Sequence, residues 1–157
     1  MSKKKIQKPR NLATVITSTT EILQAFGAAV TAFNNLNAAG GVDEFMTLLD
    51  PGVLLETING AVVYRGKPEV RDYLVDHLAP SKPVFIPTTT PVTQGVTDWF
   101  GYVKGTANWS DTDNDSDDTG VSMGYCFGFA KNPSGNWLLL IVRSSRPYTN
   151  ATSISLE

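Results

Sequence analysis

Apolar residues recur at steps of three and four along the first half of the chain, which is the spacing of one face of a helix. They predict an amphipathic helix over residues 20–37, which the small residues 38–41 should end. A second, short helix is predicted at about residues 42–49, where Asp50-Pro51-Gly52 should stop it. Proline in a first turn, followed by an apolar stripe, predicts a third helix at residues 67–78.

A hairpin is predicted before the third helix, because residues 53–58 and 61–64 flank the turn dipeptide Asn59-Gly60. Beyond Pro80 the pattern changes to an alternation of period two, which is typical of strands. Three prolines between residues 83 and 91 favour an edge strand or a loop, because proline cannot donate a ladder hydrogen bond.

Three long strands follow, at residues 95–109, 121–131 and 136–145. In the second of these, large side chains take the odd positions and small ones the even positions, so its two faces differ. The last strand is apolar on both faces, which places it in the middle of a sheet. Helices, an inserted hairpin and then long strands indicate an α+β fold.

The composition fits one domain, since 157 residues of which 41% are hydrophobic can bury a core without metals or disulfides. Cys126 and His77 are the only residues of their kinds. A disulfide within the chain and a metal site built from several cysteines or histidines are therefore excluded. We expect neither a metal nor another cofactor.

The net charge of −2 is the sum of two opposite blocks. Residues 1–10 carry five basic side chains, and residues 111–118 carry five aspartates. The aspartates have the spacing of calcium ligands, but five like charges on a hairpin tip are usually solvated. We expect a basic, disordered tail at 1–18, a folded domain at 19–146 and a C-terminal tail at 147–157.

Membrane and nucleic-acid partners are not expected. The stretch from Leu12 to Leu23 contains four threonines, a serine and a glutamate, which makes it too polar for a secretion signal. No run approaches the roughly 20 apolar residues that cross a bilayer. The basic block lacks interleaved aromatic residues, and the rest of the chain is acidic. These features predict a soluble, cytoplasmic protein.

Four turn and packing patterns carry a family resemblance: Leu36–Phe45, Leu49–Glu56, Tyr64–Leu74 and Phe129–Trp137. Together with the order of the elements, they resemble the nuclear transport factor 2-like superfamily, which includes SnoaL-like polyketide cyclases and ketosteroid isomerases. The resemblance implies a cone-shaped, curved antiparallel sheet wrapped around three N-terminal helices. It also implies an apolar pocket inside the cone.

Members of the isomerase branch use a carboxylate base, with a tyrosine and a protonated acid as oxyanion donors. In this chain the base position falls on Thr57, beside Glu56, and the tyrosine position falls on Phe33. The acid position falls on Tyr125, which keeps a donor. A shift of one residue would return Glu56 to the base position, because neighbouring residues on a strand face opposite sides.

Glu56 and Tyr125 are therefore the candidate catalytic residues, as a proton-transfer base and a hydroxyl donor. Alternatively, Glu56 faces solvent or pairs with Arg65, and the Tyr125 hydroxyl satisfies a backbone carbonyl. The expected ligand-binding residues are Phe33, Tyr64, Trp99, Tyr102 and Arg143. Arg143 can clamp a ligand carboxylate, lie at the open end of the cone or pair with a nearby acid.

Two functions remain open from the sequence. The first is a domain that binds a small apolar or carbonyl-bearing molecule, with SnoaL-like cyclase or isomerase chemistry by proton transfer. The second is a non-catalytic binding or dimerisation module. Small residues on one strand face would let a second sheet approach closely, which predicts a homodimer. They are Ser122, Gly124, Cys126, Gly128 and Ala130.

Overall fold

The computed structural model describes residues 12–57, 62–112 and 121–145. Its helical elements are α1 (Leu12–Asn34), α2 (Gly41–Met46), α3 (Gly66–Tyr73) and the π-helical turn η1 (Leu74–Leu78). Its strands are β1 (Leu49–Glu56), β2 (Val63–Arg65), β3 (Val84–Pro87), β4 (Val92–Gln94), β5 (Phe100–Ser110), β6 (Val121–Lys131) and β7 (Trp137–Ser145).

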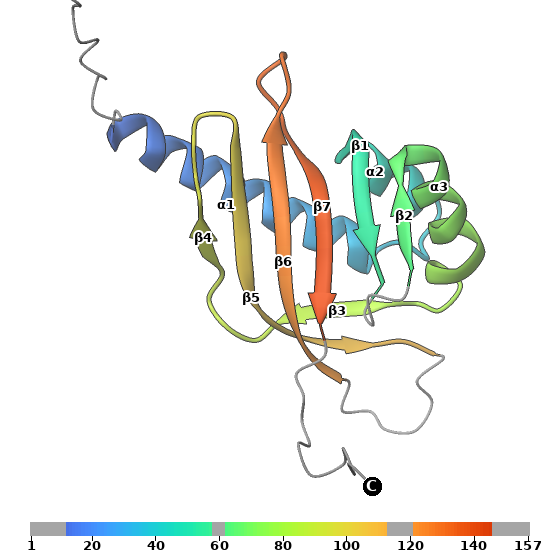
Figure 1. Cartoon of the computed structure of the whole chain (residues 1–157). Coiled ribbons are helices and arrows are strands. Elements are labelled where there is room, and N and C mark those ends of the chain that lie inside the picture. The colour runs from blue at the N-terminus through green and yellow to red at the C-terminus, as the bar shows by residue number, and fades with distance from the viewer. Residues whose placement is uncertain (1–11, 58–61, 113–120, 146–157) are drawn as a thin grey trace, which may run out of the picture.

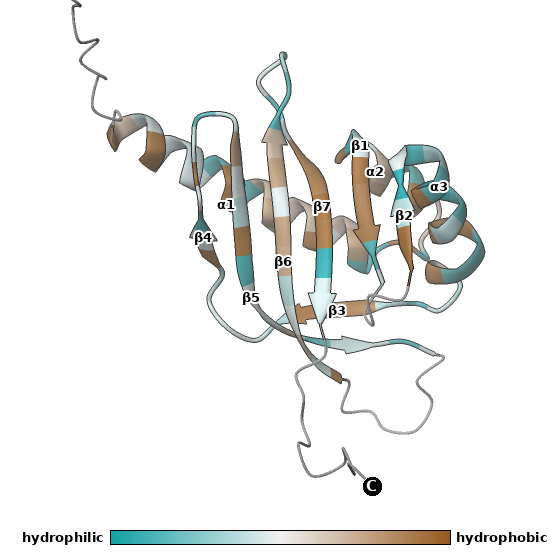
Figure 2. Cartoon of the chain, in the orientation of Figure 1, coloured by the Kyte–Doolittle hydropathy of each residue, from teal (hydrophilic) through white to brown (hydrophobic). Residues whose placement is uncertain are grey.

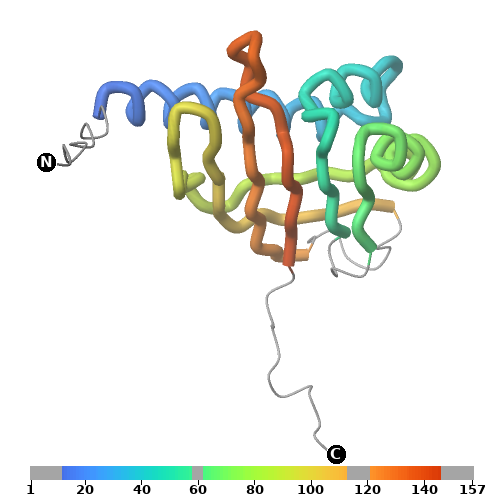
Figure 3. The backbone as a smooth tube through the Cα atoms, turned by 45° about the horizontal axis from the view of Figure 1, so that its top comes forward, coloured from blue at the N-terminus to red at the C-terminus, as the bar shows by residue number. Residues whose placement is uncertain are grey.

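The strands of the described residues form one sheet in the order β2-β1-β7-β6-β5-β3, with β4 also paired to β5. The sheet is strongly curved, and α1 crosses the face that it encloses (Figures 1 and 3). The α+β class and the central position of β7 are confirmed. The sheet is mixed rather than wholly antiparallel, because β1 pairs with β7 in parallel. The proline-rich segment supplies β3, an edge strand.

The first helix begins at Leu12, ahead of the start at residue 20 that the sequence predicts. In its threonine-rich first half the Thr20 hydroxyl donates to the Ile16 carbonyl, 3.1 Å away, a bond that competes little with the helix, and Ser18 is buried. Residues 12–18, assigned from the sequence to the basic tail, are therefore part of α1. The rest of that tail lies outside the described residues.

The strand β1 includes Asp50-Pro51-Gly52, which the sequence predicts as a stop between helix and strand. Its register with β7 shifts between Leu49 and Leu54. The proline therefore lies in an irregularity of the ladder, where a missing N–H does little harm. The Asp50 carboxylate accepts the Gly52 N–H at 2.8 Å and stabilises this bend.

The long strand predicted from residue 95 begins at Phe100 instead, because residues 95–99 form the turn that joins β4 to β5. Gly95 has a φ of 62°, in the left-handed region that favours glycine. Thr97 then holds the turn, since its hydroxyl accepts the Phe100 N–H at 3.0 Å.

The core lies between α1 and the enclosed face of the sheet. The odd positions of β6 from Met123 to Phe129 are buried there, as its alternation predicts, and they pack with Ile22 and Phe26 of α1. Figure 2 shows hydrophobic residues along β1 and much of β7, whereas α3 is mostly hydrophilic. Glu21 ties α1 to the end of the sheet by accepting the Trp137 indole N–H at 2.6 Å. No helix in the described ranges is long and apolar enough to cross a membrane.

Candidate functional site

A cavity of about 80 Å³ lies between α1, α2, α3 with η1 and the enclosed face of the sheet. Its wall is mostly apolar, with aromatic rings from Phe33, Phe45, Phe85, Trp109 and Phe127. Apart from Trp109, the lining residues with polar side-chain groups are Glu56, Thr57, Tyr73 and Ser144. Such a cavity favours an apolar molecule with few polar groups.

Phe33 lies in the cavity wall, where the sequence predicted a ligand contact. Its ring packs against three other rings, with centroid distances of 5.8 Å to Phe45, 6.3 Å to Phe85 and 5.5 Å to Trp109. These tilted and edge contacts hold the ring in one orientation. The helix α1, the strand β3 and the strand β5 thereby share one wall of the cavity.

The π-helical turn brings two residues of one helix into the same wall. Tyr73 and Leu78 both line the cavity, although residues five apart in an α-helix point about 140° away from each other. Here the Ala79 N–H donates to the Leu74 carbonyl at 2.8 Å, which closes a wider turn. The sequence predicted a regular helix and gave no signal for this turn.

Tyr73 supplies a neutral phenol at the cavity. Burial raises the pKa of Tyr73 above its ordinary value, and smaller contributions come from Tyr64 and Asp111. Close by, the Trp109 indole N–H donates to the Asp111 carboxylate at 2.8 Å. The Trp109 N–H is therefore already engaged, while its ring remains part of the wall.

Glu56 lines the cavity at the end of β1, but its carboxylate is engaged by an arginine. Leu55 is buried in the core, so Glu56 projects toward the other face of the sheet. There Glu56 Oε2 accepts the Arg143 Nε–H at 3.0 Å, and this pair replaces the alternative pairing with Arg65. The next residue, Thr57, returns to the cavity, and its hydroxyl accepts the Val62 N–H at 3.3 Å.

Tyr125 is buried among aromatic rings and does not belong to the cavity lining. It stacks on Phe26 at 5.4 Å and meets Phe85 edge-on at 5.3 Å. Its hydroxyl is buried and has no hydrogen-bond partner among the described residues. Burial raises the pKa of Tyr125, so the hydroxyl stays protonated.

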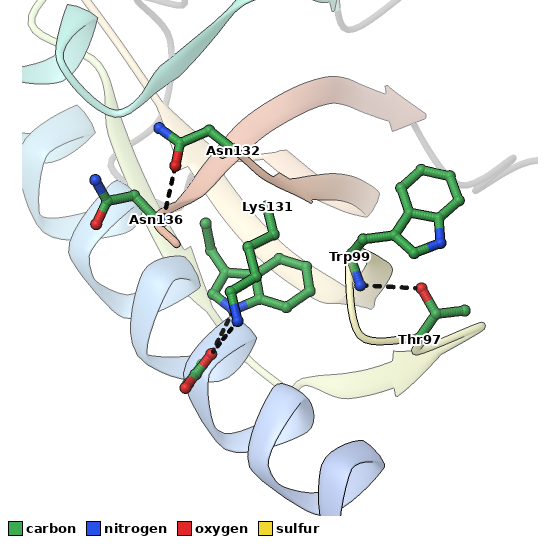
Figure 4. Close-up of polar contacts among 7 residues, drawn as sticks. Thr97, Trp99, Lys131, Asn132 and Asn136 are labelled. Carbon is green, nitrogen blue, oxygen red and sulfur yellow. Dashed lines mark hydrogen bonds and ion pairs between the residues drawn. The ribbon is translucent and has the colours of Figure 1, made fainter. Parts of the chain in front are cut away.

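The other predicted ligand contacts are dispersed. Tyr64 stacks on the Tyr73 ring at 4.3 Å, outside the cavity. Trp99 is 62% exposed in the turn before β5, and its indole points away from Lys131 (Figure 4). Tyr102 and Arg143 lie together on the outer face of the sheet, away from α1.

Several lining residues escaped sequence reasoning for one physical reason. Tyr73 and Ser144 come from a helix and a distant strand, and only the tertiary fold joins them to Thr57, which the family resemblance had already placed at the base position. Strand parity could have found Ser144, because Val142 of the same strand shares its face. No group of three His, Cys, Asp or Glu side chains in the described ranges could hold a metal ion. Most of the predicted acidic tip, from residue 113 to 118, lies outside those ranges.

Comparisons with known proteins give the class of fold. No protein-family model and no curated protein sequence matches the chain. A nuclear transport factor 2-like superfamily protein from Salmonella enterica serovar Typhimurium superposes with a TM-score of 0.72 at 12% identity, over 89% of this chain and 98% of that one. A candidate dehydratase of the same family from Streptomyces avermitilis gives 0.68 at 19% identity, over 84% and 97%.

A third similar structure, from Catenulispora acidiphila, is a complex with S-DNPA. It superposes with a TM-score of 0.65 at 13% identity, over 83% of this chain and 94% of that one. These likenesses confirm that the chain has the nuclear transport factor 2-like fold, also called cystatin-like. At these identities they define the fold and leave the chemistry to the residues of the site.

Proposed function

We propose that the chain is a small-molecule-binding domain whose cavity takes a compact apolar molecule, with a carbonyl or similar acceptor as its polar group. One observation carries the proposal: an apolar cavity with an aromatic wall, at the edge of which stand the Tyr73 phenol and the Thr57 and Ser144 hydroxyls. A neutral phenol is a suitable donor to a carbonyl oxygen. The cavity volume of about 80 Å³ is smaller than the roughly 150 Å³ of a cavity that binds benzene, so a one-ring ligand requires the wall to open slightly.

Proton transfer is the second candidate function. It is supported by the presence of Glu56 in the cavity lining and by the candidate dehydratase among proteins of the same fold. Within it, Glu56 would act as the base, as the sequence predicts. The ion pair with Arg143 and the position of Tyr125 outside the lining favour binding as the first proposal.

Acetophenone and toluene test the binding proposal, since they share a ring and differ in the carbonyl group. We expect both to raise the melting temperature, and acetophenone to do so more. Val30 lines the cavity, so Val30→Phe should fill it and abolish the effect of both compounds. The control is Val75→Phe, the same change at an exposed position outside the cavity, which should leave the effect intact. Equal stabilisation of wild type and Val30→Phe would contradict the proposal.

The same ligand separates binding from proton transfer. A base in the cavity would exchange the methyl protons of acetophenone with deuterium from heavy water, which NMR detects. Exchange by the wild type that is lost in Glu56→Gln would establish the second function. Stabilisation without exchange would leave the chain a binding domain.

A further inference from the structure

A second hollow, of about 790 Å³, lies on the outer face of the sheet. It lies across the sheet from most of the cavity wall, because neighbouring residues of β5, β6 and β7 point to opposite sides, and Glu56 and Ser144 line both hollows. Val103, Phe127 and Val142 face the core, whereas Lys104, Cys126 and Arg143 line the outer hollow. We call this hollow the outer groove.

The floor of the outer groove is formed by small residues of β6, and its sides by longer ones. Gly124 and Cys126 lie along the middle strand, with Tyr102 of β5 on one side and Ile141 of β7 on the other. Small side chains between longer neighbours leave a concave surface with room for a ligand. Gln94 and Ser145 add neutral hydrogen-bonding groups at its edges.

Two cations flank the middle of this floor. Lys104 is the register partner of Cys126, and Cys126 is the register partner of Arg143, so the three form one row across three strands. Register partners on one face have Cβ atoms about 5 Å apart. Both cations act on the pKa of the Cys126 thiol, which they lower while burial raises it by more. The two positive charges therefore converge on one part of the groove.

The cations remain available to a ligand. Lys104 is exposed and makes no ion pair within the described residues. Arg143 uses its Nε–H for Glu56, at 3.0 Å, and its side chain is still 66% exposed. The ion pair with Glu56 leaves the other guanidinium N–H groups of Arg143 free for a second acceptor. It also fixes the orientation of the planar guanidinium group. Two cations against one carboxylate give the row a net positive charge.

We propose that the outer groove is a binding site for a small organic anion, whose carboxylate or phosphate group lies between Lys104 and Arg143. Glu56 is a positioning residue that orients the guanidinium. Tyr102 and Ile141 contact the apolar part of the ligand. The site uses the opposite face of the sheet from most of the cavity wall, and Glu56 and Ser144 line both hollows.

Cys126 is the only cysteine and lies between the two cations, so its alkylation reports on the groove. Iodoacetate carries the negative charge of a ligand, whereas iodoacetamide is its neutral counterpart. We expect the rate constant for iodoacetate divided by that for iodoacetamide to be about fivefold higher in the native protein than in urea, because two cations attract the anionic reagent. The protein is used at a concentration at which sedimentation shows the monomer, and mass spectrometry follows the single product.

Lys104→Gln and Arg143→Gln should each lower that ratio toward the value in urea, and Lys82→Gln, an exposed lysine outside the groove, should leave it unchanged. Inorganic phosphate should slow the reaction with iodoacetate more than chloride does at equal ionic strength. A native ratio equal to that in urea, an equal effect of Lys82→Gln, or a thiol closed to both reagents would overturn the proposal. Alkylation of Cys126 and the melting temperature with acetophenone are separate readouts, so the two proposals fail separately.

Discussion

Gly105 lacks a side chain at a point where the phenol of Tyr125 occupies the space that one would need. A Cβ built on Gly105 would collide with the Tyr125 hydroxyl and ring, and that ring is held by Phe26 and Phe85. The two residues are register partners on β5 and β6. Glycine therefore gives a buried tyrosine its place in the core.

We expect Gly105→Ala to lower the free energy of unfolding by about 1–3 kcal/mol, because the ring cannot move away without disturbing its neighbours. Part of this loss should return when Tyr125→Phe is combined with it, since the hydroxyl is the closest atom. Urea denaturation measures both. The control is Gly27→Ala, where a Cβ meets nothing within 4 Å and the helix should gain about 1 kcal/mol. Equal behaviour of the two glycine variants would refute the explanation.

Strand parity explains why the sequence located Glu56 only in part. Leu55 is buried, so Glu56 turns outward to Arg143 and Thr57 turns back to the cavity. From the sequence alone, either Glu56 or Thr57 could face the cavity, because the pattern did not show which residue of β1 is the last buried one. The roles that the sequence analysis assigns, Glu56 as the base and Tyr125 as the hydroxyl donor, stay predictions.

At the scale of elements, Asn34 joins the last turn of α1 to the edge strand β3. Its side-chain amide donates to the Phe85 carbonyl at 2.9 Å, and its oxygen accepts the Phe85 N–H at 2.7 Å. β3 pairs with β5 on its other edge. One side chain thus satisfies two backbone groups of an otherwise open edge, where a further strand would have bonded.

Replacing this amide should have a pH-dependent effect. Asn34→Asp removes the donor and sets a carboxylate against the Phe85 carbonyl, which should lower the free energy of unfolding at neutral pH by about 2 kcal/mol. Protonation restores the donor, so the pKa of the new carboxyl is raised in the folded state. The stabilisation by the protonated carboxyl is then fully present below the unfolded pKa of about 3.9, and it is lost as the pH rises through the folded pKa.

Denaturation at about pH 3.5 and pH 7, each relative to wild type, measures this effect. The matched control is Asn35→Asp at the next, exposed position, which should change little at either pH. A loss of the same size at both pH values would show that the amide donor is unimportant.

The bounds of a helix or strand were predictable from the sequence where the residue pattern within that element determines them. The bounds of β6 match the prediction because large and small residues alternate along all of it. The start of α1, the strand character of Asp50-Pro51-Gly52 and the turn before Phe100 were missed, since each depends on hydrogen bonds or packing that local propensity does not contain. The cavity was predictable as a feature of the fold, but not its lining, which combines distant segments.

At the scale of the whole molecule, the homodimer through the outer face remains a prediction, and the charges of that face give it a salt dependence. Two copies packed on this face would bring two rows of Lys104 and Arg143 toward each other. Sedimentation equilibrium at micromolar concentration should therefore show more dimer when phosphate or salt is added. Lys82→Gln should not change the response. A monomer at every salt concentration would rule the dimer out.

The parallel pairing of β1 with β7 has a consequence for how the chain folds. Glu56 and Arg143 are neighbours across this pair, yet they are 87 positions apart in the sequence. During synthesis β1 and β2 emerge early and must wait for the last strand before they can join the rest of the sheet. Contacts of such long range close late and slow folding, because a large loop must be ordered first. Among the described strands the central one is thus also the last to be made, and a ribosome that stalls before Trp137 would hold these strands in two unjoined parts.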